Sequence, residues 1–185
     1  EGLTLSQTMV STLAGRNTKA TIYACSDFGV VRHEAVHAYC NLAFGSTGPT
    51  WYSEGMAEMG QYWEEGKREV DVNPRVIEFL RTTKEPKRLI EIVKEEQITG
   101  DSWQAYSWRW ALCHLLANNP NYNRKFRDLG IGLMTSRPGV TFEAAYGRVS
   151  KQLIFEYDQF IKNVGNGYRT DLCAWRWKHR FKDLE

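Results

Sequence analysis

The alternation of apolar and polar residues near the start of the chain predicts a strand. From Thr18 to Cys25 the sequence TKATIYAC is rich in β-branched and small residues, and apolar side chains recur at every second position. This is the repeat of a strand, in which successive side chains point to opposite faces. We therefore expect a strand over residues 18–25.

Apolar residues recur at helical spacing through most of the remaining chain. The first such segment runs from about Phe28 to Phe44, with Asp27 as its N-cap, and ends at the GSTGP sequence of residues 45–49. Ser53 is expected to cap the next helix. The pattern predicts helices from Ser53 to about Trp63, from Pro74, from Pro86 to before Thr99, and over Trp103–Ala117, Tyr122–Met134, Thr141–Tyr146 and Ser150–Val164.

A change in composition after residue 165 predicts a boundary. Residues 165–167 are Gly-Asn-Gly, and the WRWKHRFK sequence of residues 175–182 is basic and contains two tryptophans. Residues 1–165 are expected to form the main domain. Residues 166–185 are expected to be a tail or the start of a truncated adjoining region, and a basic, aromatic surface for a polymer or nucleic acid is the alternative.

Composition argues against several classes of protein. The chain has 185 residues, 42% of them hydrophobic, which is enough for one core. Its 24 basic and 22 acidic residues leave a formal charge of only +2, so we expect no nucleic-acid partner. Its apolar runs fall short of the roughly 18 residues that a membrane-spanning helix needs. Because the first residue is Glu1 and no signal pattern follows, a processed or excised fragment is expected.

The segment His33-Glu34-Ala35-Val36-His37 is an HExxH motif within the first predicted helix. Four helical residues advance by about 6 Å and bring both imidazoles to one face, where they can bind one metal ion. Zinc accepts imidazole ligands and tolerates an open position for water. Glu34 would lie beside that water and act as general base and then general acid. An amphipathic helix with two histidines and no metal is the alternative.

The next predicted helix offers a carboxylate. The sequence WYSEGMAE of residues 51–58 places Glu54 where that helix can fold back toward His33 and His37. HExxH followed by W-x-x-E-G-x-A resembles the gluzincin metallopeptidases, including their peptidase MA-like members. The resemblance implies an α+β fold, in which a small N-terminal sheet leads into a predominantly helical domain, and a Zn²⁺ ion bound by His33, His37 and Glu54.

The spacing between the motifs departs from that family. The stretch from His37 to Glu54 is shorter than is usual in the aminopeptidase branch, which leaves Glu58 as a rival ligand. Glu58 suits another task, because a carboxylate there can accept the second ring N–H of His33 or His37. A solvated helix carboxylate is the remaining alternative for Glu58.

Tyr106 is the candidate donor for the oxyanion that forms when an amide is hydrolysed. Its segment resembles the gluzincin helix whose tyrosine stabilises the tetrahedral intermediate, although Trp108 and Arg109 replace the glycine-containing part of that signature. A tyrosine that only packs in the core is the alternative. Arg109 is a candidate for orienting a substrate carboxylate.

These residues together predict a zinc-dependent peptidase that acts on a peptide or protein substrate. Two alternatives remain: a catalytically degenerate metal-binding or scaffold module that binds peptide or a cell-surface polymer, and an interaction domain without metal. An extracytoplasmic location, periplasmic or secreted, is expected. The cysteines leave free thiols and disulfides both open, since no CxxC pair occurs among Cys25, Cys40, Cys113 and Cys173.

Overall fold

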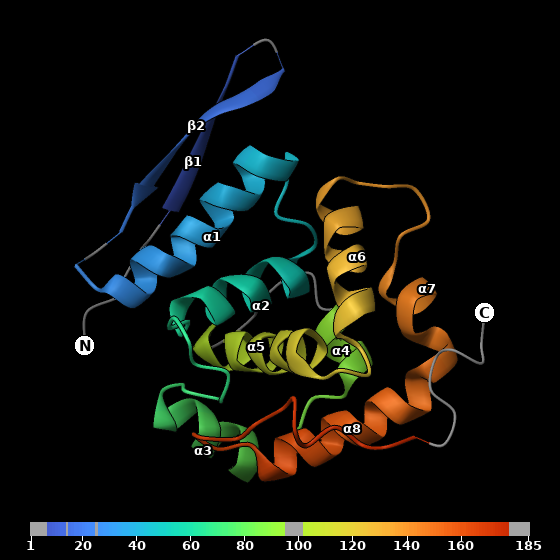
Figure 1. Cartoon of the computed structure of the whole chain (residues 1–185). Helices are drawn as coiled ribbons and strands as arrows, with labels where there is room; N and C mark the ends of the chain where they lie inside the picture. Colours follow the sequence, from blue (N-terminus) through green and yellow to red (C-terminus); the bar gives the residue numbers. More distant parts are fainter. Residues whose placement is uncertain (1–6, 14, 25, 95–101, 178–185) are drawn as a thin grey trace.

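The computed structural model describes residues 7–13, 15–24, 26–94 and 102–177, and it begins with a hairpin (Figure 1). Strands β1 (Gln7–Leu13) and β2 (Arg16–Tyr23) pair antiparallel, with a register shift between Ser11 and Thr12. Gly15 lies in the connecting turn with φ of 74°, a value that suits glycine. The hairpin packs along the first helix.

Strand β2 confirms the predicted strand over most of its length, but its partner β1 was not predicted. In the β1 sequence QTMVSTL, the apolar residues Met9, Val10 and Leu13 do not fall at every second position, so the sequence shows no strand repeat. Met9 and Leu13 are both exposed and Val10 is only half-buried, so burial of these residues does not impose a readable repeat. The predicted end of the strand at Cys25 lies outside the described residues.

Helices make up most of the rest of the described chain, and most of their bounds lie within a few residues of the predicted ones. The predicted helix from Pro86 begins only at Leu89, and its predicted end before Thr99 lies outside the described residues. Helix α1 spans Phe28–Phe44 as predicted. The others are α2 (Thr50–Gln61), α3 (Pro74–Thr82), α4 (Leu89–Lys94), α5 (Ser102–Asn118), α6 (Asn123–Met134), α7 (Phe142–Tyr146), the short 3-10 helix η1 (Gly147–Val149) and α8 (Ser150–Asn163). The fold is therefore α+β and mostly helical, with a small two-stranded hairpin at its N-terminal end.

The two ends of α1 show why its bounds were readable from the sequence. The Asp27 side chain accepts a hydrogen bond of 2.7 Å from the backbone N–H of Gly29, which is an N-cap contact. Gly45 ends the helix with φ of 90°, in the left-handed region that favours glycine. Helix α2 differs, because Pro49 occupies its N-cap position and Ser53 lies inside the helix. The prediction that Ser53 caps α2 was therefore wrong.

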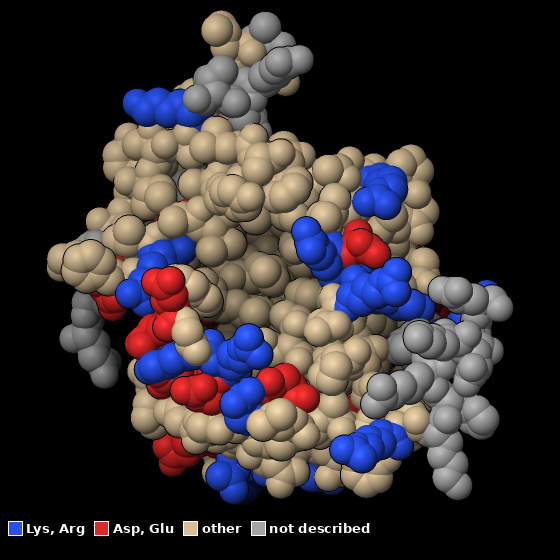
Figure 2. Space-filling view, in the orientation of Figure 1, with Lys and Arg blue, Asp and Glu red and all other residues tan. Residues whose placement is uncertain are grey.

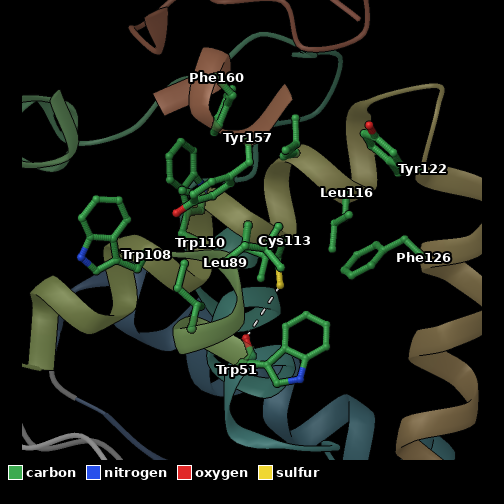
Figure 3. Close-up of a cluster of buried hydrophobic side chains, with 14 of the residues drawn as sticks. Trp51, Leu89, Trp108, Trp110, Cys113, Leu116, Tyr122, Phe126, Tyr157 and Phe160 are labelled. Carbon is green, nitrogen blue, oxygen red and sulfur yellow. Dashed lines mark hydrogen bonds between the residues drawn. The ribbon is translucent and has the colours of Figure 1, made fainter. Parts of the chain in front are cut away.

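Helix α5 is the centre of the hydrophobic core. It contacts α2, α3, α4, α6 and α8, which surround it in Figure 1. Its buried side chains include Trp108, Trp110, Cys113 and Leu116, and Figure 3 shows them packed among aromatic residues of the neighbouring helices. The Cys113 thiol points to the backbone carbonyl of Trp51 on α2, at 3.8 Å. This contact belongs to the crossing of α2 over α5.

Two glycines of α2 allow it to lie close to both neighbours. A Cβ atom on Gly55 would collide with the Cys113 sulfur and would lie 2.7 Å from the carbonyl oxygen of Arg109 on α5. A Cβ atom on Gly60 would collide with Val36 on α1. Helix α2 is thus held between α1 and α5 at distances that only glycine permits at these two points.

The described part of the C-terminal segment lies against the helical body. The Asn166 side chain exchanges hydrogen bonds of 3.0 Å with the backbone of Val72. Buried Glu156 on α8 accepts hydrogen bonds from the backbone N–H of Trp175 and from the Trp177 indole. The boundary near residue 165 stays a prediction, and residues 178–185 of the basic tail lie outside the described residues.

The surface charge and the hydropathy of the helices do not indicate a particular kind of binding partner. On the face shown in Figure 2, side chains of both signs are mixed over the lower half, while the area over α1 is largely uncharged. Within the described ranges, no helix has the length and apolar character that crossing a membrane requires.

Candidate metal centre

Three predicted ligands meet where α1 and α2 cross. The Nε2 atoms of His33 and His37 are 3.2 Å apart, and the Glu54 Oε2 atom lies 3.3 Å from the first and 3.5 Å from the second. The three side chains are 12, 14 and 21% exposed respectively, so the cluster is largely shielded but reachable from solvent. These residues form a site that could hold a metal ion.

The separations between the three atoms fit a small cation with tetrahedral ligands. Two ligands placed about 2.0–2.1 Å from a tetrahedral zinc ion lie about 3.3–3.4 Å from each other. The observed triangle of 3.2, 3.3 and 3.5 Å has this size. Two imidazoles and one carboxylate also form a donor set found in catalytic zinc sites, although other transition metals accept it. The geometry therefore fits a metal without naming the element.

Glu58 lies on the far side of His33 from the three candidate ligand atoms. Its Oε1 atom is 3.1 Å from Nδ1 of His33, whereas Nε2 of the same ring faces Glu54. A carboxylate in this position accepts the ring N–H and holds the other nitrogen ready for a metal. The structure therefore places Glu54 in the ligand triangle and Glu58 behind one of the histidines.

Ser53 occupies the corresponding place behind His37, which the sequence analysis missed. Its Oγ atom lies 3.2 Å from Nδ1 of His37, and the serine is buried, with 8% of its surface exposed. The sequence pattern assigned Ser53 to the helix cap because serine is common there. The only signal that could have found it is its place directly before Glu54.

The carboxylates change the protonation of the metal-free cluster. Burial alone lowers the pKa of His33, but hydrogen bonds and charge from Glu54 and Glu58 outweigh it and raise that pKa to about 9. Burial opposes ionisation of Glu54, yet its hydrogen bonds to His33 and His37 lower its pKa to about 2. Without metal, the cluster is therefore held together by a protonated His33 imidazole and the ionised Glu54 carboxylate.

Tyr106 projects from α5 toward the same cluster. Its ring centroid lies 5.9 Å from that of His33, at an interplanar angle of 60°. Burial, followed by the negative charges of Glu54 and Glu58, raises the pKa of Tyr106, while Arg109 acts in the opposite direction. The phenol therefore stays protonated at neutral pH and can donate a hydrogen bond.

Glu34 and Arg109 are more enclosed than the other candidates. Glu34 is 6% exposed on α1, and its charge is among those that raise the pKa of Tyr106. Arg109 is fully buried on α5, so this structure does not place it where a substrate carboxylate could reach it. A further histidine, His114, is a core residue, with Nε2 3.1 Å from Thr170 Oγ1 and its ring stacked on Phe160.

Comparisons of the chain with protein-family models, with curated proteins and with solved structures found no match. The resemblance to gluzincins therefore rests on sequence motifs, chiefly those at residues 33–37 and 51–57, with a looser match around Tyr106. The cluster of His33, His37 and Glu54, which could hold a metal ion, stands independently of that resemblance.

Proposed function

We propose that the chain is a zinc-dependent peptidase of gluzincin type, in which His33, His37 and Glu54 bind the zinc ion. The observation that carries the proposal is the triangle of three donor atoms at 3.2, 3.3 and 3.5 Å, with Tyr106 beside it. The HExxH motif adds the expected acid–base residue, Glu34, and the W-x-x-E-G-x-A motif contains Glu54. A bound zinc ion would supply Lewis acidity toward a water molecule and a peptide carbonyl.

The side chains of this chain then divide the proton transfers and the charge stabilisation. Glu34, next in sequence to His33, accepts a proton from the attacking water and delivers it to the leaving amine. Tyr106 donates a hydrogen bond to the carbonyl oxygen as negative charge builds there. The phenol keeps its proton at neutral pH, since burial and the nearby carboxylates raise its pKa. Glu58 holds the His33 ring in the ligating orientation.

The test pairs metal content with peptide cleavage. The wild-type chain is expected to contain about one zinc per molecule by elemental analysis and to cleave members of a peptide library. His37→Ala removes a ligand and is expected to lose both zinc and activity. Glu34→Gln removes the proton carrier but no ligand, so we expect it to keep zinc and lose at least about 100-fold in turnover.

A catalytically degenerate metal-binding or scaffold module is the second candidate. The observation that favours it is the burial of Glu34, whose side chain has little access to solvent. In that case zinc binds and His37→Ala releases it, but the wild-type chain cleaves no peptide. A wild-type chain that takes up no zinc, even when zinc is supplied, would exclude both candidates.

A further inference from the structure

The two histidines of the candidate metal centre are supported by different partners. Behind His33, a carboxylate oxygen of Glu58 lies 3.1 Å from Nδ1. Behind His37, the hydroxyl oxygen of Ser53 lies 3.2 Å from Nδ1. In each ring the other nitrogen, Nε2, faces Glu54. Each imidazole therefore has one nitrogen in the ligand triangle and one nitrogen against α2.

The backbone of Ser53 is part of the first turn of α2. Its N–H donates a 2.9 Å hydrogen bond to the carbonyl of Pro49, the N-cap residue of the helix. Ser53 is buried and precedes Glu54 directly. A movement of the helix would thus shift the ligand and the hydroxyl together. Because Ser53 and Glu54 are adjacent in one helix, the hydroxyl and the carboxylate keep their relative positions on the two sides of the His37 ring.

We propose that Ser53 is a positioning residue for metal binding: its hydroxyl oxygen accepts the Nδ1–H of His37 and keeps Nε2 directed at the ion. The inference rests on the proposed function, because it presupposes the metal site. An imidazole that binds metal through Nε2 must carry its proton on Nδ1, and an acceptor for that proton selects the required tautomer and fixes the ring plane. Without the hydroxyl, the ring of His37 can turn about its χ2 bond.

A hydroxyl does this without adding charge. The cluster already contains the carboxylates of Glu54 and Glu58, both within 3.5 Å of a histidine nitrogen. A third carboxylate, placed behind His37, would make the site more negative and weaken the Lewis acidity of a bound cation. Ser53 orients the ring and leaves the charge of the site unchanged.

The test measures zinc affinity by competition with a chromophoric chelator in four proteins. Ser53→Ala is expected to bind zinc about 10- to 100-fold more weakly than wild type, the range seen when a residue that supports a ligand is removed. Ser53→Thr keeps a hydroxyl and is expected to stay near wild type. Ser107→Ala is the matched control, because it removes another buried serine hydroxyl, which donates to the Trp103 carbonyl at 2.8 Å.

A second readout separates positioning from general loss of structure. In the cobalt-substituted proteins, the visible absorption spectrum reports ligand geometry, and we expect it to change in Ser53→Ala but not in Ser107→Ala. Equal zinc affinity and equal spectra in Ser53→Ala and wild type would overturn the inference, and this comparison decides it even if Ser53→Thr does not fold. If wild type binds zinc and shows the expected difference but cleaves no peptide, the proposed peptidase fails while the role of Ser53 stands.

Discussion

The positions of individual side chains separate Glu54 from Glu58 as the proposed third metal ligand. Glu54 Oε2 lies within 3.5 Å of Nε2 of both histidines, whereas Glu58 Oε1 faces Nδ1 of His33. We therefore expect Glu54→Ala to abolish stoichiometric zinc binding and Glu58→Ala to weaken it by about 10- to 100-fold. Zinc affinity by chelator competition measures both, with the exposed Glu78 of α3 changed to alanine as control. The reverse order would make Glu58 the ligand.

The hydroxyl of Tyr106 is expected to matter for rate and not for metal. Removing one hydrogen-bond donor to a developing oxyanion typically costs about 10²- to 10³-fold in kcat. Tyr106→Phe should therefore lower kcat by this factor and keep its zinc. Steady-state kinetics and elemental analysis measure the two quantities. The control is Tyr146→Phe, which removes a buried hydroxyl that donates to the carbonyl of Tyr122. Unchanged kinetics in Tyr106→Phe would leave this tyrosine with a packing role only.

At this scale the sequence predicted the parts of the site that depend on local geometry. His33 and His37 share a face of α1 because four residues are about one helical turn. The partner of each Nδ1 atom was harder to predict, since it depends on how α2 crosses α1. The contact of Ser53 also depends on where α2 begins. Because the helix begins at Thr50, Ser53 lies inside it, and its hydroxyl faces His37 instead of capping the helix.

At the scale of elements, the crossing of α2 with α5 is expected to depend on Gly55. A methyl group there would meet the Cys113 sulfur and the Arg109 carbonyl, so Gly55→Ala must push the helices apart. Overpacking of this kind typically costs about 1–3 kcal/mol. Urea denaturation should show this loss of unfolding free energy, together with weaker zinc binding because Glu54 is adjacent.

The matched control for that experiment is Gly147→Ala. A Cβ atom on Gly147 would lie 3.5 Å from its nearest neighbour, Glu143 Cγ, and its φ of −54° suits alanine. Its unfolding free energy is therefore expected to stay the same or rise slightly. Equal stability of Gly55→Ala and Gly147→Ala would show that the α2–α5 crossing tolerates a side chain.

The elements that the sequence predicted best carry their own start and stop signals. Helix α1 has Asp27 at one end and Gly45 at the other, and its predicted bounds are confirmed. Helix α2 begins at Thr50, after Pro49, and no side chain caps it. The β1 sequence has no alternating apolar repeat, and its pairing with β2 is a contact between segments that local periodicity does not encode. The features that the sequence did not predict, the start of α2 and the strand β1, depend on contacts with other parts of the fold.

For the whole molecule, the charges of the metal-free cluster predict a pH dependence of stability. The pKa of His33 is raised from 6.5 to about 9, so the stabilisation is fully present below pH 6.5 and is lost as pH rises through about 9. The Glu54 pKa is lowered from 4.5 to about 2, so its share is present above pH 4.5 and is lost as pH falls through about 2.

The measurement is the thermal midpoint of the metal-free chain between pH 6.5 and 9, where we expect a steady fall. Lower pH is avoided, because burial lowers the pKa of His114 to about 4 and its protonation in the unfolded chain opposes folding below pH 6.5. His33→Asn should flatten the profile. Added zinc should reverse the slope, because the metal competes with the proton on His33. A flat profile in the wild-type chain would contradict the prediction.

The hydrogen bonds of Glu156 also bear on proteolysis. This buried carboxylate accepts from Tyr122 and Asn119 in the helical body and from Trp175 and Trp177 in the C-terminal segment. A protease must first detach a segment from the body before cleaving it, and here detachment would remove two of the hydrogen-bond donors to the buried Glu156 side chain. Residues 166–177 should therefore resist digestion as the helices do. Exchanging Glu156 for alanine would turn the same residues into a cleavable appendage.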